Sequence, residues 1–171
     1  AALIAACTAC GARSATSNPD TIQLMKELGE SIGIAFQSLD YLLYYEGNGL
    51  TGKISGNDIR EKKITLPLIY SLEKASLSRK RHILHIIGNN KKSRSEVDEV
   101  VRFVSENGGM EYAALRMNQY RDKALAILDT YPESEVRESL REFVRYTVSR
   151  DKYIFLDPPL LPPNRGEKIC K

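Results

Sequence analysis

Two segments of the chain carry polar residues whose types and spacing could do chemistry. The first holds a glutamine, an aspartate and two tyrosines at the spacing i, i+3, i+4 and i+7: Gln37, Asp40, Tyr41 and Tyr44. In a helix this spacing puts all four on one face. Three apolar residues occupy the neighbouring stripe: Phe36, Leu39 and Leu43. A polar stripe beside an apolar one predicts the wall of a cavity, and a partly exposed helix is the alternative that the spacing leaves open.

The second segment, residues 52–67, reads as a polar loop with two glycines and four basic side chains: Lys53, Arg60, Lys62 and Lys63. Lysines on a loop beside a helix end are suited to hold phosphate groups, because fixed positive charge and free backbone N–H groups meet there. A solvated lysine-rich loop without a ligand is the alternative reading of the same residues.

Length and charge exclude some classes of function. The 171 residues suffice for one domain or a large part of one. With 25 basic and 22 acidic residues the net charge is +3, which is too small and too scattered to indicate nucleic-acid binding. The longest uncharged stretch, residues 1–12, is shorter than the roughly 20 apolar residues of a transmembrane helix.

The three cysteines do not form a disulfide framework, because their number is odd and their spacing is unpaired. Cys7 and Cys10 could form a redox pair or half a metal site. Their alanine-rich surroundings instead predict that both pack inside a helix of small residues. We expect the reducing cytoplasm as the compartment.

Helical periodicity repeats along the chain, so the predicted fold class is all-α. We expect helices over residues 1–12, 20–45, 66–72, 77–87, 97–104, 110–128 and 136–147. Ser95-x-x-Asp98 resembles a capping box for the fifth of them. Residues 47–64, which begin with Gly47-Asn48-Gly49, show no usable period and are predicted to be a loop. No segment alternates convincingly as a strand would.

The last helix and the tail complete the expected organisation. The last helix should bury five residues against its neighbours: Val136, Leu140, Phe143, Val144 and Thr147. Residues 153–171 hold four of the seven prolines, which cannot continue a helix. We therefore expect one helical domain over residues 1–152 and an unstructured tail over 153–171. A proline-rich ligand for a partner is the alternative for the tail.

Together the two polar segments resemble a known family. The chain resembles the C-terminal half of the trans-polyprenyl diphosphate synthases, which carry Gly-x-x-Phe-Gln-x-x-Asp-Asp-x-x-Asp followed by a loop with Gly-Lys-x-x-Gly-x-Asp and Lys-x-Thr-Leu-Pro. The residues in register are Gly33, Phe36, Gln37, Asp40, Gly52, Lys53, Gly56, Asp58, Lys63, Thr65, Leu66 and Pro67. The segment Gly108-Gly109-x-Glu111-Tyr112-Ala113 resembles a further family segment. The resemblance covers roughly residues 1–152 and implies an orthogonal helical bundle of the isoprenoid synthase type.

The resemblance also implies an activity. Members of this family condense isopentenyl diphosphate with an allylic diphosphate in isoprenoid biosynthesis, use Mg²⁺ held by two aspartate-rich helices, and form homodimers. Carried over by position, Gln37, Lys53 and Lys63 would bind the substrate diphosphate, and Asp40 would be a metal ligand. Arg150-Asp151-Lys152 resembles the basic ending of some members. No residue of this chain is assigned a catalytic role.

The chain departs from the family pattern in two ways. Tyr41 and Tyr44 stand where the motif has aspartates, and a neutral phenol with a pKa of about 10 cannot replace a carboxylate as a Mg²⁺ ligand. The first aspartate-rich motif has no counterpart in residues 1–171. We therefore expect little catalysis by this chain alone. A non-catalytic helical module that binds a partner prenyl synthase is the alternative.

Overall fold

A computed structural model describes residues 1–46 and 57–149, which form eight helices and no strand. They are α1 (Ala2–Ala15), α2 (Pro19–Glu46), α3 (Asn57–Arg60), α4 (Leu66–Lys74), α5 (Leu77–Gly88), α6 (Arg94–Glu106), α7 (Gly109–Asp129) and α8 (Glu135–Ser149). The predicted all-α class is confirmed for this part of the chain. Within these residues no helix combines the length and the apolarity that crossing a bilayer requires.

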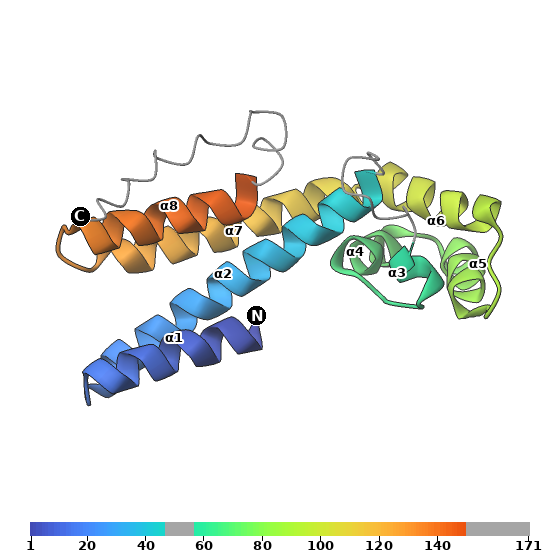
Figure 1. The fold of residues 1–171 in the computed structure, drawn as a ribbon. Coiled ribbons are helices and arrows are strands. Elements are labelled where there is room, and N and C mark those ends of the chain that lie inside the picture. Colours follow the sequence, from blue (N-terminus) through green and yellow to red (C-terminus); the bar gives the residue numbers. More distant parts are fainter. Residues whose placement is uncertain (47–56, 150–171) are drawn as a thin grey trace, which may run out of the picture.

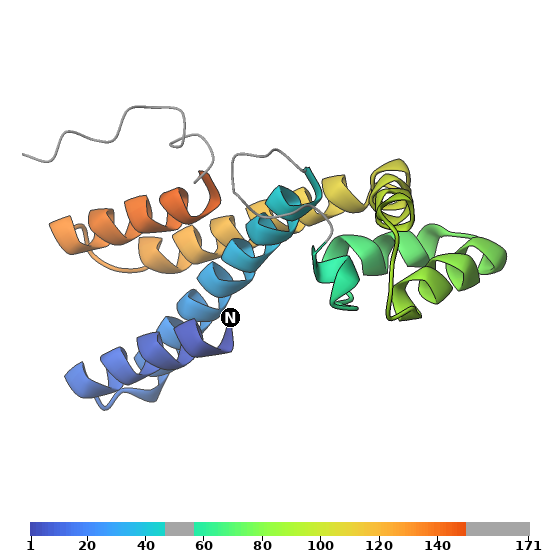
Figure 2. The same cartoon turned by 45° about the vertical axis from the view of Figure 1, so that its right-hand side comes forward.

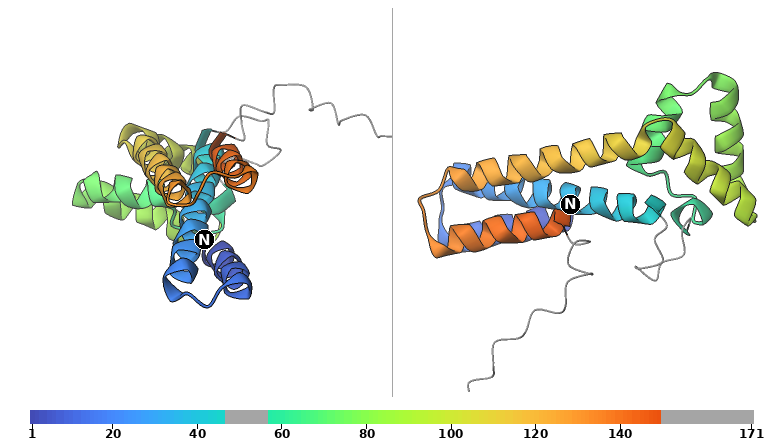
Figure 3. Two further views of the ribbon diagram at one scale, coloured as in Figure 1. Left: turned by 90° about the vertical axis from the view of Figure 1, so that its left-hand side faces the viewer. Right: turned by 90° about the horizontal axis from the view of Figure 1, so that it is seen from above.

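Two long helices, α2 and α7, pack along each other and form the frame of the molecule (Figure 1). Helix α1 lies on α2, and α8 folds back beside α7 as the second half of a hairpin (Figure 3). The short helices α3–α6 gather at the C-terminal end of α2, where α7 begins (Figure 2). This arrangement puts the end of the predicted polar stripe next to the second polar segment.

Glycines allow α1 to approach α2 closely. A Cβ atom on Gly29 would lie 2.2 Å from the Thr8 Oγ1 atom and 2.7 Å from the Ile4 carbonyl oxygen. The side of α1 that faces away from α2 stays open. Cys7 and Cys10 are both exposed free thiols there, so the prediction that they pack inside the protein is wrong. An alanine-rich helix predicts close packing, but only on the side that meets a neighbour.

Two apolar cores hold the helices together. The first lies under α3–α6 and receives two tyrosines from the end of α2; its members are Tyr44, Tyr45, Ile59, Leu68, Leu72, Ile83, Ile86, Ile87, Val97, Val100, Phe103 and Val104. The second runs between α2, α7 and α8 and contains Leu28, Ile32, Ala124, Ile127, Leu128 and Val144. Within each helix the core members recur at helical spacing, which is the period that predicted these helices.

The start of α6 corrects one prediction. The capping box is formed by Ser93 and Glu96: the Ser93 Oγ atom accepts from the Glu96 amide at 3.2 Å, and the Glu96 carboxylate accepts from the Ser93 amide at 2.7 Å. The sequence offers the same pattern twice, two residues apart, and Ser95-x-x-Asp98 was the wrong choice. The helix begins at Arg94, earlier than the predicted start at residue 97.

Two further expectations fail in part. Residues 57–60 are helical as α3, although a loop was predicted, because a single turn anchored by the buried Ile59 is too short to show a period. In α8, Val144 and Thr147 are buried, but Val136, Leu140 and Phe143 are exposed in this structure. Apolar spacing marks a face of a helix without showing what covers it. Gly47-Asn48-Gly49, the tail 153–171 and its proposed boundary lie outside the described residues.

Candidate functional site

The end of α2 presents two adjacent buried tyrosines to the second polar segment. The Tyr44 hydroxyl oxygen accepts a hydrogen bond from the backbone N–H of Asp58, at the start of α3. The Tyr45 hydroxyl lies 2.9 Å from the Thr65 Oγ1 atom, at the residue that precedes α4. Their rings meet edge to face, with centroids 5.7 Å apart. The two phenols therefore attach both ends of residues 58–65 to α2.

Asp58 connects Tyr44 to the predicted diphosphate lysine. Its backbone carbonyl accepts from the Lys63 amide at 2.8 Å, and its carboxylate lies 3.1 Å from the Lys63 Nζ atom. Ile59, with an exposed fraction of 1%, fixes the turn to the first core. Lys62 has a φ of 59°, a left-handed conformation that lets the chain reverse here. Residues 58–63 thus form a tight turn, which we call the lysine turn.

The far side of the lysine turn is attached to the α5–α6 connection. The Arg60 guanidinium donates to the Lys92 carbonyl oxygen at 3.3 Å, and the Lys62 Nζ atom donates to the Asn90 Oδ1 atom at 2.6 Å. The buried Lys92 ammonium donates to the Asn89 carbonyl at 2.7 Å. Burial lowers the pKa of Lys92, and the positive charges of Lys62 and Arg60 add to this effect. The turn is held from two directions.

Lys63 itself points to solvent from this fixed turn. Its ammonium is 2.6 Å from the Glu61 carboxylate as well as 3.1 Å from that of Asp58, and hydrogen bonds to these two acids raise its pKa. More than half of its side chain is exposed. Exposed ion pairs of this kind are weak, so a more highly charged anion can take their place.

The remaining predicted site residues are divided between the described and undescribed parts of the chain. On α2, Gln37 is exposed, and Asp40 and Tyr41 are half-buried. They lie on the same helix as Tyr44, one or two turns before it, so the predicted shared helix face is present. Lys53 and residues 150–152 lie outside the described residues. The structure thus brings Tyr44 and Lys63 together through Asp58.

The donor set on α2 does not suit magnesium. Of the three positions where the family motif has aspartates, only Asp40 carries a carboxylate. Burial raises the pKa of Tyr44 well above its ordinary value, and that of Tyr45 to about 12, so both phenols stay protonated. The Tyr44 oxygen is already occupied by the Asp58 amide. No group of three or more potential ligands among His, Cys, Asp and Glu occurs in residues 1–46 and 57–149.

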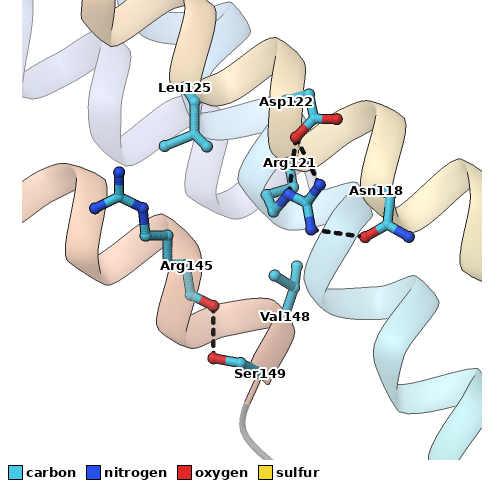
Figure 4. Close-up of a pocket in the computed structure, with 7 residues that line it drawn as sticks. All are labelled: Asn118, Arg121, Asp122, Leu125, Arg145, Val148 and Ser149. Carbon is cyan, nitrogen blue, oxygen red and sulfur yellow. Dashed lines mark hydrogen bonds and ion pairs between the residues drawn. The ribbon is translucent and has the colours of Figure 1, made fainter.

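A hollow of the described structure lies elsewhere, between α7 and α8 (Figure 4). It measures about 580 Å³ and is lined by Asn118, Arg121, Asp122, Leu125, Arg145, Val148 and Ser149. Its charged groups are paired: Arg121 donates to Asn118 and Asp122, both at 2.8 Å. None of the residues predicted to bind substrate lines it. We therefore place the candidate site at the lysine turn.

Sequence reasoning missed the residues that support the lysine turn. Asp58 and Thr65 were in register with the family motif but had no predicted role. Arg60 was counted among the basic side chains of the loop without a role of its own, and Tyr45 and Lys92 were not singled out. The sequence did hold a signal for Tyr45. Consecutive residues of a helix point to different sides, so Tyr45, which directly follows Tyr44, reaches a different partner. Arg60 and Lys92 are 32 residues apart, and no local pattern predicts their contact.

Comparisons with known proteins relate the chain to one family. Residues 1–104 match the polyprenyl synthetase family. A geranylfarnesyl diphosphate synthase of Aeropyrum pernix is 34% identical over 154 residues, which is 88% of this chain and 47% of the relative. The chain spans about half the length of the curated relatives it matches.

Solved structures show the same similarity. A geranylgeranyl pyrophosphate synthase from Bacteroides thetaiotaomicron aligns with a TM-score of 0.78 at 33% identity, over 86% of this chain and 49% of that one. A polyprenyl synthase from Caulobacter crescentus CB15, complexed with calcium and isoprenyl diphosphate, aligns with a TM-score of 0.74 at 31% identity, over 86% of this chain and 45% of that one. The described helices adopt the all-α isoprenoid synthase fold, and the chain belongs to the polyprenyl synthetase family.

Proposed function

We propose that the protein to which this chain belongs is a prenyltransferase, which condenses isopentenyl diphosphate with an allylic diphosphate to give a longer polyprenyl diphosphate. Within it, this chain would correspond to the C-terminal half of the enzyme and would supply part of the diphosphate site. The observation that carries this proposal is Lys63, exposed on a turn that is fixed to α2 and to the α5–α6 connection at the motif position of a diphosphate lysine.

The proposed roles follow from chemistry and position. Lys63 and Lys53 would hold diphosphate oxygens with fixed positive charge, and Gln37 would donate from its exposed amide. Such charge stabilises a leaving diphosphate as its bond to the prenyl group breaks. Asp40 remains the one proposed metal ligand on α2. Since one carboxylate is a poor Mg²⁺ site by itself, a magnesium requirement of the whole protein would depend on other groups, including the substrate phosphates.

We also propose an oligomeric state and a location for the protein. The resemblance implies a homodimer, which sedimentation of the full-length protein would test. The free thiols of Cys7 and Cys10 are compatible with a reducing compartment, and the cytoplasm is the proposed location.

One observation favours a second candidate function. Tyr41 and Tyr44 replace two aspartates, so the protein could be a motif-poor subunit that binds an intact synthase and modulates it. A pull-down with an intact prenyl synthase addresses this candidate. The resulting complex should elongate with a different rate or product length from the synthase alone.

The prenyltransferase proposal is tested with the full-length protein. Purified protein is incubated with isopentenyl diphosphate, an allylic diphosphate primer and magnesium, and the products are separated by chain length. We expect products longer than the primer. A folded full-length protein that makes none, at any primer length, contradicts the proposal.

A further inference from the structure

Tyr44 makes a specific contact with the lysine turn, although the family motif has an aspartate at this position. Its side chain leaves the last turn of α2 and is buried, with an exposed fraction of 9%. Its hydroxyl oxygen accepts a hydrogen bond from the N–H of Asp58, the first residue of the lysine turn. A backbone N–H in this position would otherwise lack a partner, because the first turn of a helix has no intrahelical acceptors.

Movement of Asp58 would carry Lys63 with it. The Asp58 carbonyl holds the Lys63 amide at 2.8 Å, and the carboxylate of the same residue holds the Lys63 Nζ atom at 3.1 Å. A chain of three contacts therefore runs from the Tyr44 oxygen, through Asp58, to the lysine ammonium. Tyr45, Arg60 and Lys62 fix the other parts of the turn. Among the described residues, Tyr44 holds the Asp58 backbone, to which the lysine is attached, and the buried Ile59 anchors the next residue of the turn in the first core.

The same contact is unavailable to a shorter acid. An aspartate at position 44 would end several atoms before the phenol oxygen does, and its charge would face the Asp58 carboxylate, which already acts unfavourably on any negative charge at Tyr44. A metal ion between two such carboxylates would relieve that repulsion. A neutral phenol reaches the backbone directly and needs no ion.

We propose that Tyr44 is a positioning residue for diphosphate, and that its hydrogen bond to the Asp58 backbone fastens the lysine turn to α2 without a divalent cation. This inference rests on the proposed diphosphate-binding role of Lys63. It adds that the anion site of this chain is formed by protein contacts alone. Inorganic pyrophosphate should then bind in the presence of a chelator.

The experiment compares the 171-residue wild type with Tyr44→Phe, which removes only the hydroxyl oxygen. Tyr112→Phe is the matched control, because it removes the same atom from a tyrosine on α7 whose ring stacks on Tyr70. Two quantities are measured: hydrogen exchange of the Asp58 amide by NMR, and the affinity for inorganic pyrophosphate by calorimetry with EDTA present. Low ionic strength is used, because salt screens an exposed site.

For Tyr44→Phe we expect Asp58 exchange to be faster by about tenfold, and pyrophosphate binding to be weaker by about fivefold, as the loss of one hydrogen bond implies. Tyr112→Phe should change neither. A Tyr44→Phe chain with wild-type exchange at Asp58 and wild-type affinity overturns the proposal. So does a wild type that binds pyrophosphate only when magnesium is added.

Two further outcomes are also decisive. If neither EDTA nor magnesium gives any binding to the wild type, the diphosphate role of this chain fails as well, which separates that failure from the failure of Tyr44 alone. If circular dichroism shows that Tyr44→Phe is unfolded, hydrogen exchange in the wild type still tests the proposal. Its Asp58 amide should exchange at least about tenfold more slowly than an unprotected amide. An unprotected rate at Asp58 contradicts the proposed hydrogen bond.

Discussion

Asp58 and Lys63 are joined twice, through the backbone at 2.8 Å and through their side chains at 3.1 Å. The double connection fixes both the path of the lysine turn and the direction of the Lys63 ammonium. The lysine turn is also attached to Tyr44 and to the α5–α6 connection. The Lys63 ammonium is therefore exposed but held at a defined position.

Replacing Lys63 should remove most of the pyrophosphate affinity. Lys63→Gln keeps a polar side chain but loses the charge, and a hydrogen bond to a charged group corresponds to about a tenfold change in affinity or more. Lys91→Gln is the control, since Lys91 is also exposed and lies in the α5–α6 connection, outside the lysine turn. Calorimetry with pyrophosphate checks both. Equal affinities of the two variants would mean that the lysine turn is not the binding site.

Titration of the tyrosines should show late ionisation of the buried pair. Burial raises the pKa of Tyr45 to about 12, above the ordinary value of about 10. A folded-state pKa above the unfolded value means that the stabilisation is complete below pH 10 and is lost as the pH rises towards 12. Tyrosinate absorbance should therefore include a late rise towards pH 12, and Tyr45→Phe should reduce it. A single stage near the ordinary pKa would contradict the buried positions.

Helix α1 should depend on the small residue at position 29. Gly29→Ala places a Cβ atom 2.2 Å from the Thr8 Oγ1 atom and should lower the free energy of unfolding by roughly 1–3 kcal/mol. Gly11→Ala is the matched control, because no atom lies within 4 Å of the new Cβ. It should be stabilising by up to about 1 kcal/mol, as alanine favours a helix interior. Urea unfolding of both variants measures the difference, and the same sign in both would count against the α1–α2 contact.

The N-cap of α6 distinguishes the observed capping box from the predicted one. Ser93→Ala should lower the free energy of unfolding by about 1 kcal/mol, because the Glu96 amide loses its acceptor. Ser95→Ala should have a smaller effect, since Ser95 contacts only the Ser93 hydroxyl there. Thermal unfolding compares the two. A larger loss from Ser95→Ala would restore the capping box expected from the sequence.

The sequence predicted the helices better than it predicted their surroundings. Spacing alone predicted helices over residues 20–45 and 97–104, which α2 and α6 confirm, because a helical period needs no knowledge of distant residues. It could not show that Val136 and Phe143 are exposed, since an apolar face looks the same with or without a neighbour. The motif at the candidate site likewise named Lys63. It could not name Lys92, whose contact with Arg60 depends on the folded chain.

The replacement of aspartates by tyrosines also has an asymmetric consequence. The Tyr44 hydroxyl accepts a hydrogen bond from the Asp58 backbone. Tyr41 is half-buried and lies one turn earlier on α2. Restoring both acids would therefore exchange one kind of site for another. It would remove the phenol contact and supply a second and a third carboxylate beside Asp40, a donor set that suits Mg²⁺.

Calorimetry of pyrophosphate binding, with and without magnesium, tests the central claim most directly. The wild-type chain is compared with the Tyr41→Asp, Tyr44→Asp double variant at one pH and ionic strength. We expect the wild type to bind pyrophosphate in EDTA without tighter binding on addition of magnesium, whereas the double variant should bind tightly only when magnesium is present. A wild type whose affinity rises about tenfold on addition of magnesium would show that a metal ion, and not Tyr44, completes the diphosphate site.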